Sequence, residues 1–301
     1  MDYELRKRGA ARHLVSKSAT FTGASGNVGG ETLKQAVAAG LPVRAAYQSS
    51  DKAQSAPRGV DTVLLDYAKP ETIRPALKGI ATVFLVSPAV GNLAELEANV
   101  TRECGPAGVT RIVKLSALGG RQAIFPSLHH DSEEHIERSG VPYTFLPANG
   151  FMQNVAAYYG ETIRSQSTFY AAQGDGAVSH VDVRDVAAAA VKVLSGAGHE
   201  GKTYALTGPE ALTNEQMAQI LSRVAGREIK YVDLPPVEVK KAMLAAGIPE
   251  WSADAVLDLQ RLYREGKASQ ISPDVAGLTG RKPRSFEEYA RDHEGAWRAQ
   301  V

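Results

Sequence analysis

Thr22-Gly23-Ala24-Ser25-Gly26-Asn27-Val28-Gly29 is the stretch that decides the fold. It follows a short apolar run at 19–22 and precedes a helical pattern that continues through Val37. Glycines at these three positions fit a strand that turns sharply, lets backbone N–H groups approach a pyrophosphate and opens a closely packed helix. The N-terminus of that helix favours negative charge. The stretch therefore predicts a dinucleotide site, and an ordinary structural turn is the alternative.

Strand-like and helical segments alternate through the first half of the chain. Apolar runs with strand character lie at 43–47, 63–65, 82–86, 111–116 and 143–146, and helical stretches lie at 70–78, 93–108 and 129–138. Such alternation implies right-handed crossovers and a parallel sheet that is covered on both faces. The predicted fold class is α/β, a doubly wound and mostly parallel Rossmann sheet.

The second half predicts a smaller, mainly helical C-terminal substrate subdomain over the sheet edge where ligands bind. We expect strands at 178–181 and 204–206, a helix over 186–194 capped by Asp182, and capping boxes at Thr213-x-x-Gln216 and Ser285-x-x-Glu288. The predicted division is an N-terminal arm at 1–18, a Rossmann domain at 19–154 to which 178–207 returns, and a substrate-binding subdomain at 155–177 and 208–301.

Composition favours a small-molecule partner. The 301 residues carry a net charge of +1, which does not indicate a nucleic-acid-binding surface. Cys104 is the only cysteine, so we expect neither a disulfide framework nor a metal site. No apolar run approaches the ~20 residues of a membrane span, and no signal peptide is evident. We expect a cytoplasmic monomer or homodimer whose basic N-terminal arm is frayed rather than a transit peptide.

Further motifs follow the glycine turn in a fixed order. They are Asp66-Tyr67, Val113-Lys-Leu-Ser-Ala-Leu-Gly119, His129-x-x-x-Glu133, Ser139-Gly-Val-Pro-Tyr-Thr144, Asn149-Gly-Phe-Met-Gln-Asn154, Asp182-Val-Arg-Asp185 and Leu206-Thr-Gly-Pro209. With them the chain from about Ala19 onward resembles the atypical short-chain dehydrogenase/reductases of the NmrA-like group. That group includes quinone reductases, triphenylmethane-dye reductases and NADP(H)-sensing regulators. Because it hosts unrelated functions, the resemblance leaves the substrate open.

The end of the second strand bears on cofactor choice. In this fold an acid there holds the ribose 2′-hydroxyl of NAD, and an arginine faces the 2′-phosphate of NADP. Gln48 stands where relatives tend to have arginine, but Lys52 and the hydroxyls of Ser49 and Ser50 offer donors to a phosphate. We expect NADP(H) to be preferred and NAD(H) to be possible. The alternative is that Lys52 and Arg44 are solvated surface charges.

The resemblance implies further cofactor contacts. Asp66 and Tyr67 are similar to residues that border the adenine, although Asp66 also suits a helix cap before Pro70. Pro147 stands where relatives often have arginine. The expected cofactor-binding residues are Gly23, Ser25, Gly26, Asn27, Val28, Gly29, Gln48, Lys52, Asp66, Tyr67, Ser87, Pro88, Ser116, Pro147 and Asn149.

Typical short-chain dehydrogenases use Tyr-x-x-x-Lys to exchange a proton with the substrate oxygen. The pattern occurs at Tyr3/Lys7, before the nucleotide-binding strand, and at Tyr263/Lys267, far beyond the sheet and interrupted by Gly266. Both occurrences look accidental. An ordinary ketone is hard to reduce without this pair, because the alkoxide must be protonated as hydride arrives.

The helix where that motif belongs carries His129-x-x-x-Glu133 instead. Side chains at i and i+4 share one helix face, so His129 is predicted to donate a proton, with Glu133 raising its pKa. A surface histidine with a helix-stabilising acid is the alternative. His130 points elsewhere and is expected to be exposed.

The remaining expected site residues surround the nicotinamide. Ser116 ends the fifth strand, where it can hydrogen-bond a substrate or the carboxamide, with strand-end capping as the alternative. Asn149 is a second orienting group. The expected substrate wall is Phe151, Met152, Asn154 and Tyr158, to which Tyr159 and Trp251 can add aromatic surface.

These residues predict an NAD(P)H-dependent reductase. Its acceptor is expected to be electron-poor, such as a quinone, iminium ion or activated aromatic compound, for which positioning against the nicotinamide suffices. The proton comes from His129 or from water. The alternative is a non-catalytic NAD(P)(H) sensor whose covering loops order on cofactor binding and recruit a regulatory protein partner. A cofactor-assisted isomerase or lyase is a third, less favoured hypothesis.

Overall fold

The sheet at the centre of the molecule is parallel throughout. Within the residues that the computed structural model describes, 18–299, it has seven strands in the order β3-β2-β1-β4-β5-β6-β8. The strands are β1 (Ala19–Phe21), β2 (Val43–Tyr47), β3 (Asp61–Leu64), β4 (Thr82–Leu85), β5 (Arg111–Ala117), β6 (Tyr143–Ala148) and β8 (Lys202–Thr203). The order reverses between β1 and β4, which places a ligand crevice at their carboxyl ends. The predicted fold class is confirmed.

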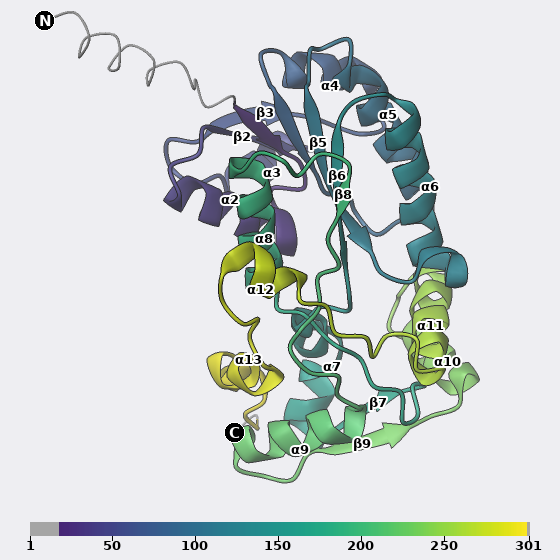
Figure 1. Cartoon of the computed structure of the whole chain (residues 1–301). Helices are drawn as coiled ribbons and strands as arrows, with labels where there is room; N and C mark the ends of the chain where they lie inside the picture. Colours follow the sequence, from purple (N-terminus) through teal and green to yellow (C-terminus); the bar gives the residue numbers. More distant parts are fainter. Residues whose placement is uncertain (1–17, 300–301) are drawn as a thin grey trace, which may run out of the picture.

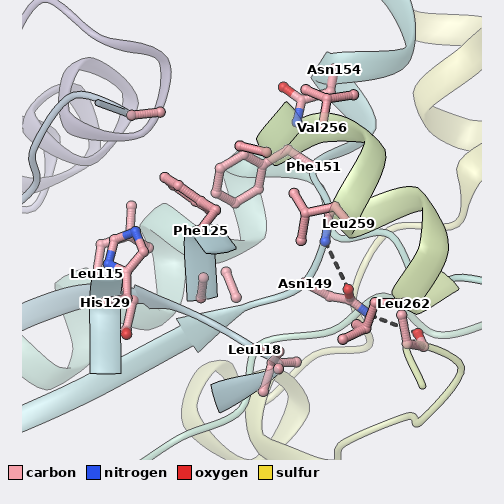
Figure 2. A pocket seen from close by; sticks show the side chains of 18 of the residues that line it. Leu115, Leu118, Phe125, His129, Asn149, Phe151, Asn154, Val256, Leu259 and Leu262 are labelled. Atoms are coloured by element: carbon pink, nitrogen blue, oxygen red, sulfur yellow. Dashed lines mark hydrogen bonds between the residues drawn. The ribbon is translucent and has the colours of Figure 1, made fainter. Parts of the chain in front are cut away.

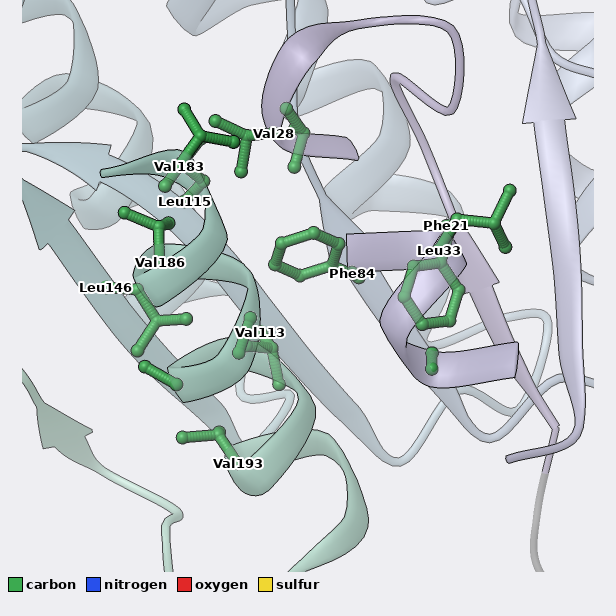
Figure 3. Packing of buried hydrophobic residues seen from close by; sticks show 14 of the residues in the cluster. Phe21, Val28, Leu33, Phe84, Val113, Leu115, Leu146, Val183, Val186 and Val193 are labelled. Carbon is green, nitrogen blue, oxygen red and sulfur yellow. The ribbon is translucent and has the colours of Figure 1, made fainter. Parts of the chain in front are cut away.

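Helices cover both faces of this sheet (Figure 1). One face carries α2 (Asn27–Ala38) and α8 (Val183–Ser195), and the other carries α4 (Pro70–Leu77), α5 (Leu93–Cys104) and α6 (Ile124–Arg138). On the first face Phe21 and Phe84 meet edge-on with ring centroids 5.6 Å apart, and α8 adds Val186 and Val193 to the same cluster (Figure 3). Burial of each such side chain contributes roughly 1.5–3 kcal/mol and holds the strands that carry the site.

Apart from α8 and β8, much of the second half of the chain packs at one end of the sheet, around a separate apolar cluster that contains Phe169, Met217 and Trp297 (Figure 1). In the described range β7 (Thr168–Ala171) and β9 (Lys230–Asp233) form a small parallel sheet there. The helices of this part are α7 (Met152–Gln166), α9 (Asn214–Ala225), α10 (Pro236–Ala245), α11 (Glu250–Arg264), α12 (Asp274–Thr279) and α13 (Phe286–Asp292). In the first half, the short helix α3 (Ser50–Ala53) follows β2.

Local capping signals hold in the structure. The Asp182 carboxylate accepts a hydrogen bond from the Arg184 N–H at 2.8 Å and caps α8. Thr213 and Ser285 both form the reciprocal capping boxes that their sequences predict, at the starts of α9 and α13. Among residues 18–299, no helix is long and apolar enough to cross a membrane.

Several segment predictions were wrong. The 178–181 segment makes single bridges, Val178 to Leu212 and Val181 to Phe151, because different segments flank it and no ladder forms. The last strand is 202–203 rather than 204–206, α6 begins five residues before His129, and α7 was not predicted. The predicted arm at 1–18 and the Tyr3/Lys7 pair lie outside the described residues, apart from Ser18. The division into a Rossmann domain and a substrate subdomain stays a prediction.

Candidate active site

A cavity of about 800 Å³ lies at the carboxyl ends of the central strands. Its sheet side is formed by the start of α2 and by residues that follow or end β4, β5 and β6, including Gly26, Ser87, Ser116 and Asn149. Its opposite side carries an apolar stripe on α11 formed by Val256, Leu259 and Leu262, and Phe151 and Leu118 also line the cavity (Figure 2). The cavity therefore joins a polar strand-end wall to an apolar helical wall.

The glycine turn needs glycine because other backbone segments approach it closely, and not only because glycine is flexible. Gly23 has φ +61°, and a Cβ there would lie 2.7 Å from the carbonyl oxygen of Val86. A Cβ on Gly29 would overlap the carbonyl oxygen of Gly23 and lie 2.6 Å from its carbon. Gly26 precedes α2, whose first-turn N–H groups lack partners within their own helix. The turn thus leaves a narrow backbone cradle and a helix N-terminus, which fit a pyrophosphate.

The end of β2 brings Gln48 and Lys52 together. Lys52 Nζ donates to Gln48 Oε1 at 3.1 Å, and the Ser49 hydroxyl accepts from the Lys52 N–H at the start of α3. Arg44 lies at the other end of the strand, where it pairs with Asp61 at 2.7 Å. Lys52 is therefore the cation that stands beside Gln48, whereas Arg44 is held elsewhere.

Asp66 and Tyr67 are anchored to the protein. Asp66 Oδ1 accepts from the Ala68 N–H at 3.0 Å, and the residue at the N-cap of α4 is Lys69, so Asp66 closes a local turn rather than capping the helix. The Tyr67 hydroxyl donates to the Val86 carbonyl at 2.7 Å, and burial raises its pKa. Through this bond Tyr67 reaches the residue that follows β4, one of the two strands between which the sheet order reverses.

His129 faces the sheet and meets a lysine, not the predicted glutamate. Its Nδ1 lies 2.8 Å from Lys114 Nζ, while Glu133 Oε2 lies 3.5 Å from His130. Burial and the neighbouring ammonium lower the pKa of His129 well below its ordinary value. The prediction that Glu133 raises this pKa was wrong, because the buried face of α6 runs through His129, Ser132 and Ile136 and leaves Glu133 at its edge. His130 is partly exposed, as predicted.

Ser116 carries a buried hydroxyl at the end of β5. The residue is only 4% exposed, and its Oγ makes no hydrogen bond to any residue in the range 18–299. Buried hydroxyls are nearly always partnered, and this one lies in the wall of the cavity. Strand-end capping would need a bond that is not made, whereas a carboxamide or an acceptor oxygen would supply the missing partner.

Asn149 lines the cavity, but its amide group is used to hold the protein together. The two Nδ2 hydrogens go to Ser179 Oγ and the Ala268 carbonyl, each at 2.8 Å, and Oδ1 accepts from the Gly150 N–H (Figure 2). The side-chain donors of Asn149 are therefore engaged within the protein, and its role as an orienting group stays a prediction. The residue joins the end of β6 to two distant segments instead.

The predicted substrate wall is confirmed only in part as a set of cavity-lining residues. Phe151, Asn154 and Tyr158 line the cavity. Met152 is 1% exposed and packs in the C-terminal apolar cluster. At the start of α7 its side chain points away from that of its neighbour Phe151, which lines the cavity. Trp251 also lines the cavity, whereas Tyr159 borders a smaller adjoining cavity of about 100 Å³.

The other expected contacts divide by position. Of the predicted cofactor residues, those that line the cavity are Gly26, Asn27, Val28, Ser87, Ser116 and Asn149. Pro88 and Ser25 are exposed beside it. Pro147 is buried in β6, where its carbonyl accepts from the Leu206 N–H at 2.8 Å. The cavity therefore adjoins the start of α2 and the carboxyl ends of β4, β5 and β6.

Sequence reasoning missed that Tyr263 and Lys267 reach this cavity. They do not form a catalytic pair: α11 ends at Arg264, Gly266 has φ +73°, and Lys267 Nζ lies 2.7 Å from Glu265. Burial raises the pKa of Tyr263 to about 12. The apolar periodicity of α11 was visible in the sequence, but its place over the strand ends is a tertiary feature.

Sequence reasoning also missed Lys114 and Glu97, which are both fully buried and lie 2.9 Å apart. A signal was present. Lys114 interrupts the apolar strand 111–116, and a lysine in the middle of a covered strand needs a buried partner. Nothing local identified Glu97, on a helix before that strand, as the partner.

Comparisons with known proteins agree with this geometry. The sequence profile of the NmrA-like family matches residues 16–290. The NAD(P)H azoreductase of Xenophilus azovorans is 34% identical over 281 residues, which are 92% of this chain and 98% of the relative. The structure of the NADPH-dependent quinone oxidoreductase QOR2 from Escherichia coli with NADPH has a TM-score of 0.84 at 28% identity, covering 91% and 99% of the two chains. The Citrobacter sp. triphenylmethane reductase with NADP(H) has a TM-score of 0.81 at 27% identity, covering 92% and 99%.

Proposed function

Because the chain belongs to the NmrA-like family, we propose that it is an NAD(P)H-dependent reductase that transfers hydride to an electron-poor acceptor. The observation that carries this proposal is that one cavity joins the glycine turn, a Ser116 hydroxyl with no hydrogen-bond partner among residues 18–299, and an apolar wall. The acceptor class is a quinone, an iminium ion or an activated aromatic compound. Relatives named azoreductase, quinone oxidoreductase and triphenylmethane reductase act on compounds of this electronic type.

The residues divide the work of binding. The backbone of the glycine turn and the N-terminus of α2 would hold the pyrophosphate, and Ser116 would orient the carboxamide or the acceptor. NAD(P)H, when bound, supplies the hydride. Phe151 and the α11 stripe exclude water and present an apolar surface to a flat acceptor. His129, or a water molecule beside it, supplies the proton.

NADP(H) is the proposed cofactor, with NAD(H) as a weaker one. Lys52 Nζ already lies within hydrogen-bond distance of Gln48 at the position next to the ribose 2′ substituent in this fold. A 2′-phosphate would give that ammonium a charged partner. Gln48, Ser49 and Lys52 together would then replace the arginine that relatives tend to have. A cytoplasmic location and a monomeric or homodimeric state belong to the same proposal.

The second candidate is an NAD(P)(H) sensor that binds a regulatory protein partner. The observation that favours it is that, among residues 18–299, neither tyrosine of the cavity lining is activated. Burial raises the pKa of Tyr158 and raises that of Tyr263 to about 12, and Lys267 is paired with Glu265. A sensor would bind the cofactor tightly without turnover.

One experiment separates the two candidates. NADPH oxidation is followed with a panel of quinones, azo dyes, triphenylmethane dyes and iminium compounds, and cofactor binding is measured by calorimetry on the same preparation. The surface variant Val237→Ser is the matched control, because Val237 is 68% exposed on α10. Turnover with at least one acceptor class supports the reductase. Tight binding with background oxidation across the panel contradicts it and favours the sensor.

A further inference from the structure

A cluster of buried polar side chains lies directly behind the cavity wall. Lys114 on β5 and Glu97 on α5 are both fully buried, and their Nζ and Oε2 atoms lie 2.9 Å apart. The free-energy cost of removing two charged groups from water exceeds the gain from their packing, unless further hydrogen bonds satisfy both groups. The remaining bonds of this pair therefore indicate what it is for.

Lys114 uses all of its donors. Its Nζ lies 2.9 Å from Glu97 Oε2, 2.8 Å from His129 Nδ1 and 3.1 Å from the Leu115 carbonyl oxygen. An ammonium group has three N–H donors and no acceptor, so each of these atoms accepts one hydrogen bond. His129 Nδ1 must consequently carry a lone pair. A neutral imidazole then has its proton on Nε2, the nitrogen that is left for the cavity.

Glu97 is held as the matching anion. Ser87 Oγ donates to its Oε1 at 2.6 Å, and Ser132 Oγ donates to its Oε2. Three donors therefore satisfy the Glu97 carboxylate, which is the counter-ion of the Lys114 ammonium. Ser87 also lines the cavity, and the ring of Phe125 packs edge-on against His129 with centroids 4.7 Å apart. The imidazole ring is thus fixed on two sides.

We propose that Lys114 is a positioning residue that holds His129 as a neutral Nε2–H donor toward the reacting acceptor and supplies the proton that His129 passes on. This inference rests on the proposed function and identifies its acid. It assigns Glu97, Ser87 and Ser132 to the support of the ammonium. In this proposal a lysine and histidine pair replaces the tyrosine of a typical short-chain dehydrogenase. The lysine lies on a strand and the histidine on a helix, whereas the residues of Tyr-x-x-x-Lys share one helix.

The proton transfer balances when one proton is taken up from solvent in each turnover. After the acceptor has taken up hydride, its oxygen or nitrogen carries an electron pair and forms a bond to the Nε2 proton of His129. As the Nε2–H bond breaks, one N–H proton of Lys114 moves to Nδ1, so the ring stays neutral and the lysine becomes an amine. A proton from bulk solvent, relayed through water in the cavity, then binds Nε2, and the Nδ1 proton returns to Lys114. Glu97 remains a carboxylate throughout.

The test begins with the tautomer of His129 in the free protein. In ¹⁵N-histidine-labelled protein, long-range ¹H–¹⁵N NMR correlations distinguish the two neutral tautomers from the cation, and His129→Gln assigns the signal. We expect a neutral ring with its proton on Nε2 across the pH range in which a free imidazole titrates. A cationic ring near neutral pH, or a proton on Nδ1, would overturn the proposal.

The variant that removes the lysine must also remove its counter-charge, because Lys114→Met alone would strand Glu97 in the core. We therefore use the double variant Lys114→Met/Glu97→Gln. The Nε2–H preference should disappear, and kcat should fall about 100-fold, as for loss of a general acid, with a much smaller change in KM and in NADPH affinity. An unchanged tautomer or an unchanged kcat would refute the role of Lys114.

Thr101→Val is the matched control. Thr101 is buried on the same helix as Glu97, and its hydroxyl donates to the Glu97 backbone carbonyl at 2.9 Å. This variant perturbs packing near the cluster without touching its side chains, so tautomer and kcat should stay at the wild-type values. Failure of the two proposals is distinguishable. If no acceptor is reduced, the proposed function fails, whereas the NMR result alone decides whether Lys114 positions His129.

Discussion

Asp258 on α11 accepts a hydrogen bond from the Ile124 N–H at 2.7 Å, so the helix that covers the cavity also caps the helix that carries His129. Arg261, one turn later on α11, donates to the Gln122 carbonyl at 2.7 Å. A carboxylate at a helix N-terminus satisfies a free N–H group and complements the helix dipole. The apolar wall of the cavity is therefore fastened to α6 at a defined point.

Replacing Asp258 with alanine should loosen this attachment. We expect a loss of about 1 kcal/mol in the free energy of unfolding, as for removal of a helix cap, together with a raised KM for the acceptor and unchanged NADPH affinity. Urea unfolding and steady-state kinetics measure the two effects. Glu250→Ala is the control, because Glu250 is on the same helix but pairs with Lys240. A KM equal to that of the control would contradict this link.

The glycine turn allows a comparison of two neighbouring glycines. Gly29→Ala should abolish measurable NADPH binding, because its Cβ would overlap the backbone of Gly23. Gly30→Ala should be much milder, since its Cβ would lie 3.1 Å from the Ala24 carbonyl oxygen and a small shift relieves it. Calorimetric titration of both variants with NADPH is the measurement. Equal affinities would show that the turn does not hold the cofactor.

Cofactor preference should depend on Lys52. Lys52→Ala should weaken NADPH binding about tenfold, the effect of losing one charge-assisted hydrogen bond, and leave NADH binding unchanged. Arg44→Ala is the control, since Arg44 lies on the neighbouring strand β2 but is engaged by Asp61. Titration of each protein with both cofactors gives the ratio. A clear wild-type preference for NADH would show the phosphate site to be wrong.

Ser116 should separate activity from stability. Ser116→Ala removes a buried hydroxyl that makes no bond to residues 18–299, so the free energy of unfolding should stay constant or rise. In the reductase, kcat/KM should fall about tenfold, because a hydrogen bond to the ligand is lost. Thr20→Val is a matched control: Thr20 Oγ1 is also buried without a partner in that range, but it lies in β1 outside the cavity lining. A similar kcat/KM in both variants would contradict the assignment of Ser116 as a ligand-binding residue.

Stability should fall as the solution becomes acidic through the histidine range. Burial lowers the pKa of His129 well below its ordinary value and lowers that of His180 to about 4. The unfolded chain therefore binds more protons than the folded protein between about pH 6.5 and 4, so the stability present above pH 6.5 is lost as pH falls through this window. Urea unfolding at a series of pH values measures the slope. His180→Gln should reduce it, and an unaltered slope would count against this origin.

How much could be predicted from the sequence depends on the range over which each signal acts. The turn from Thr22 to Gly29 and the caps at Asp182 and Thr213 depend on neighbouring residues, and the structure has them as predicted. The pairing of His129 with Glu133 was wrong although their spacing was right, because the rotation of α6 is set by packing against β5. Sheet and helix positions that only folding defines bring Glu97 to Lys114 and α11 to the strand ends.

The stripe of Val256, Leu259 and Leu262 forms a wall of the cavity that can be varied independently of the strand-end wall. These three side chains come from one helix, whereas the diphosphate cradle and the proton donor belong to the sheet and its own helices. Libraries randomised at these three positions should therefore change acceptor preference and leave cofactor affinity unchanged. New acceptors can then be selected without altering the residues that bind the cofactor.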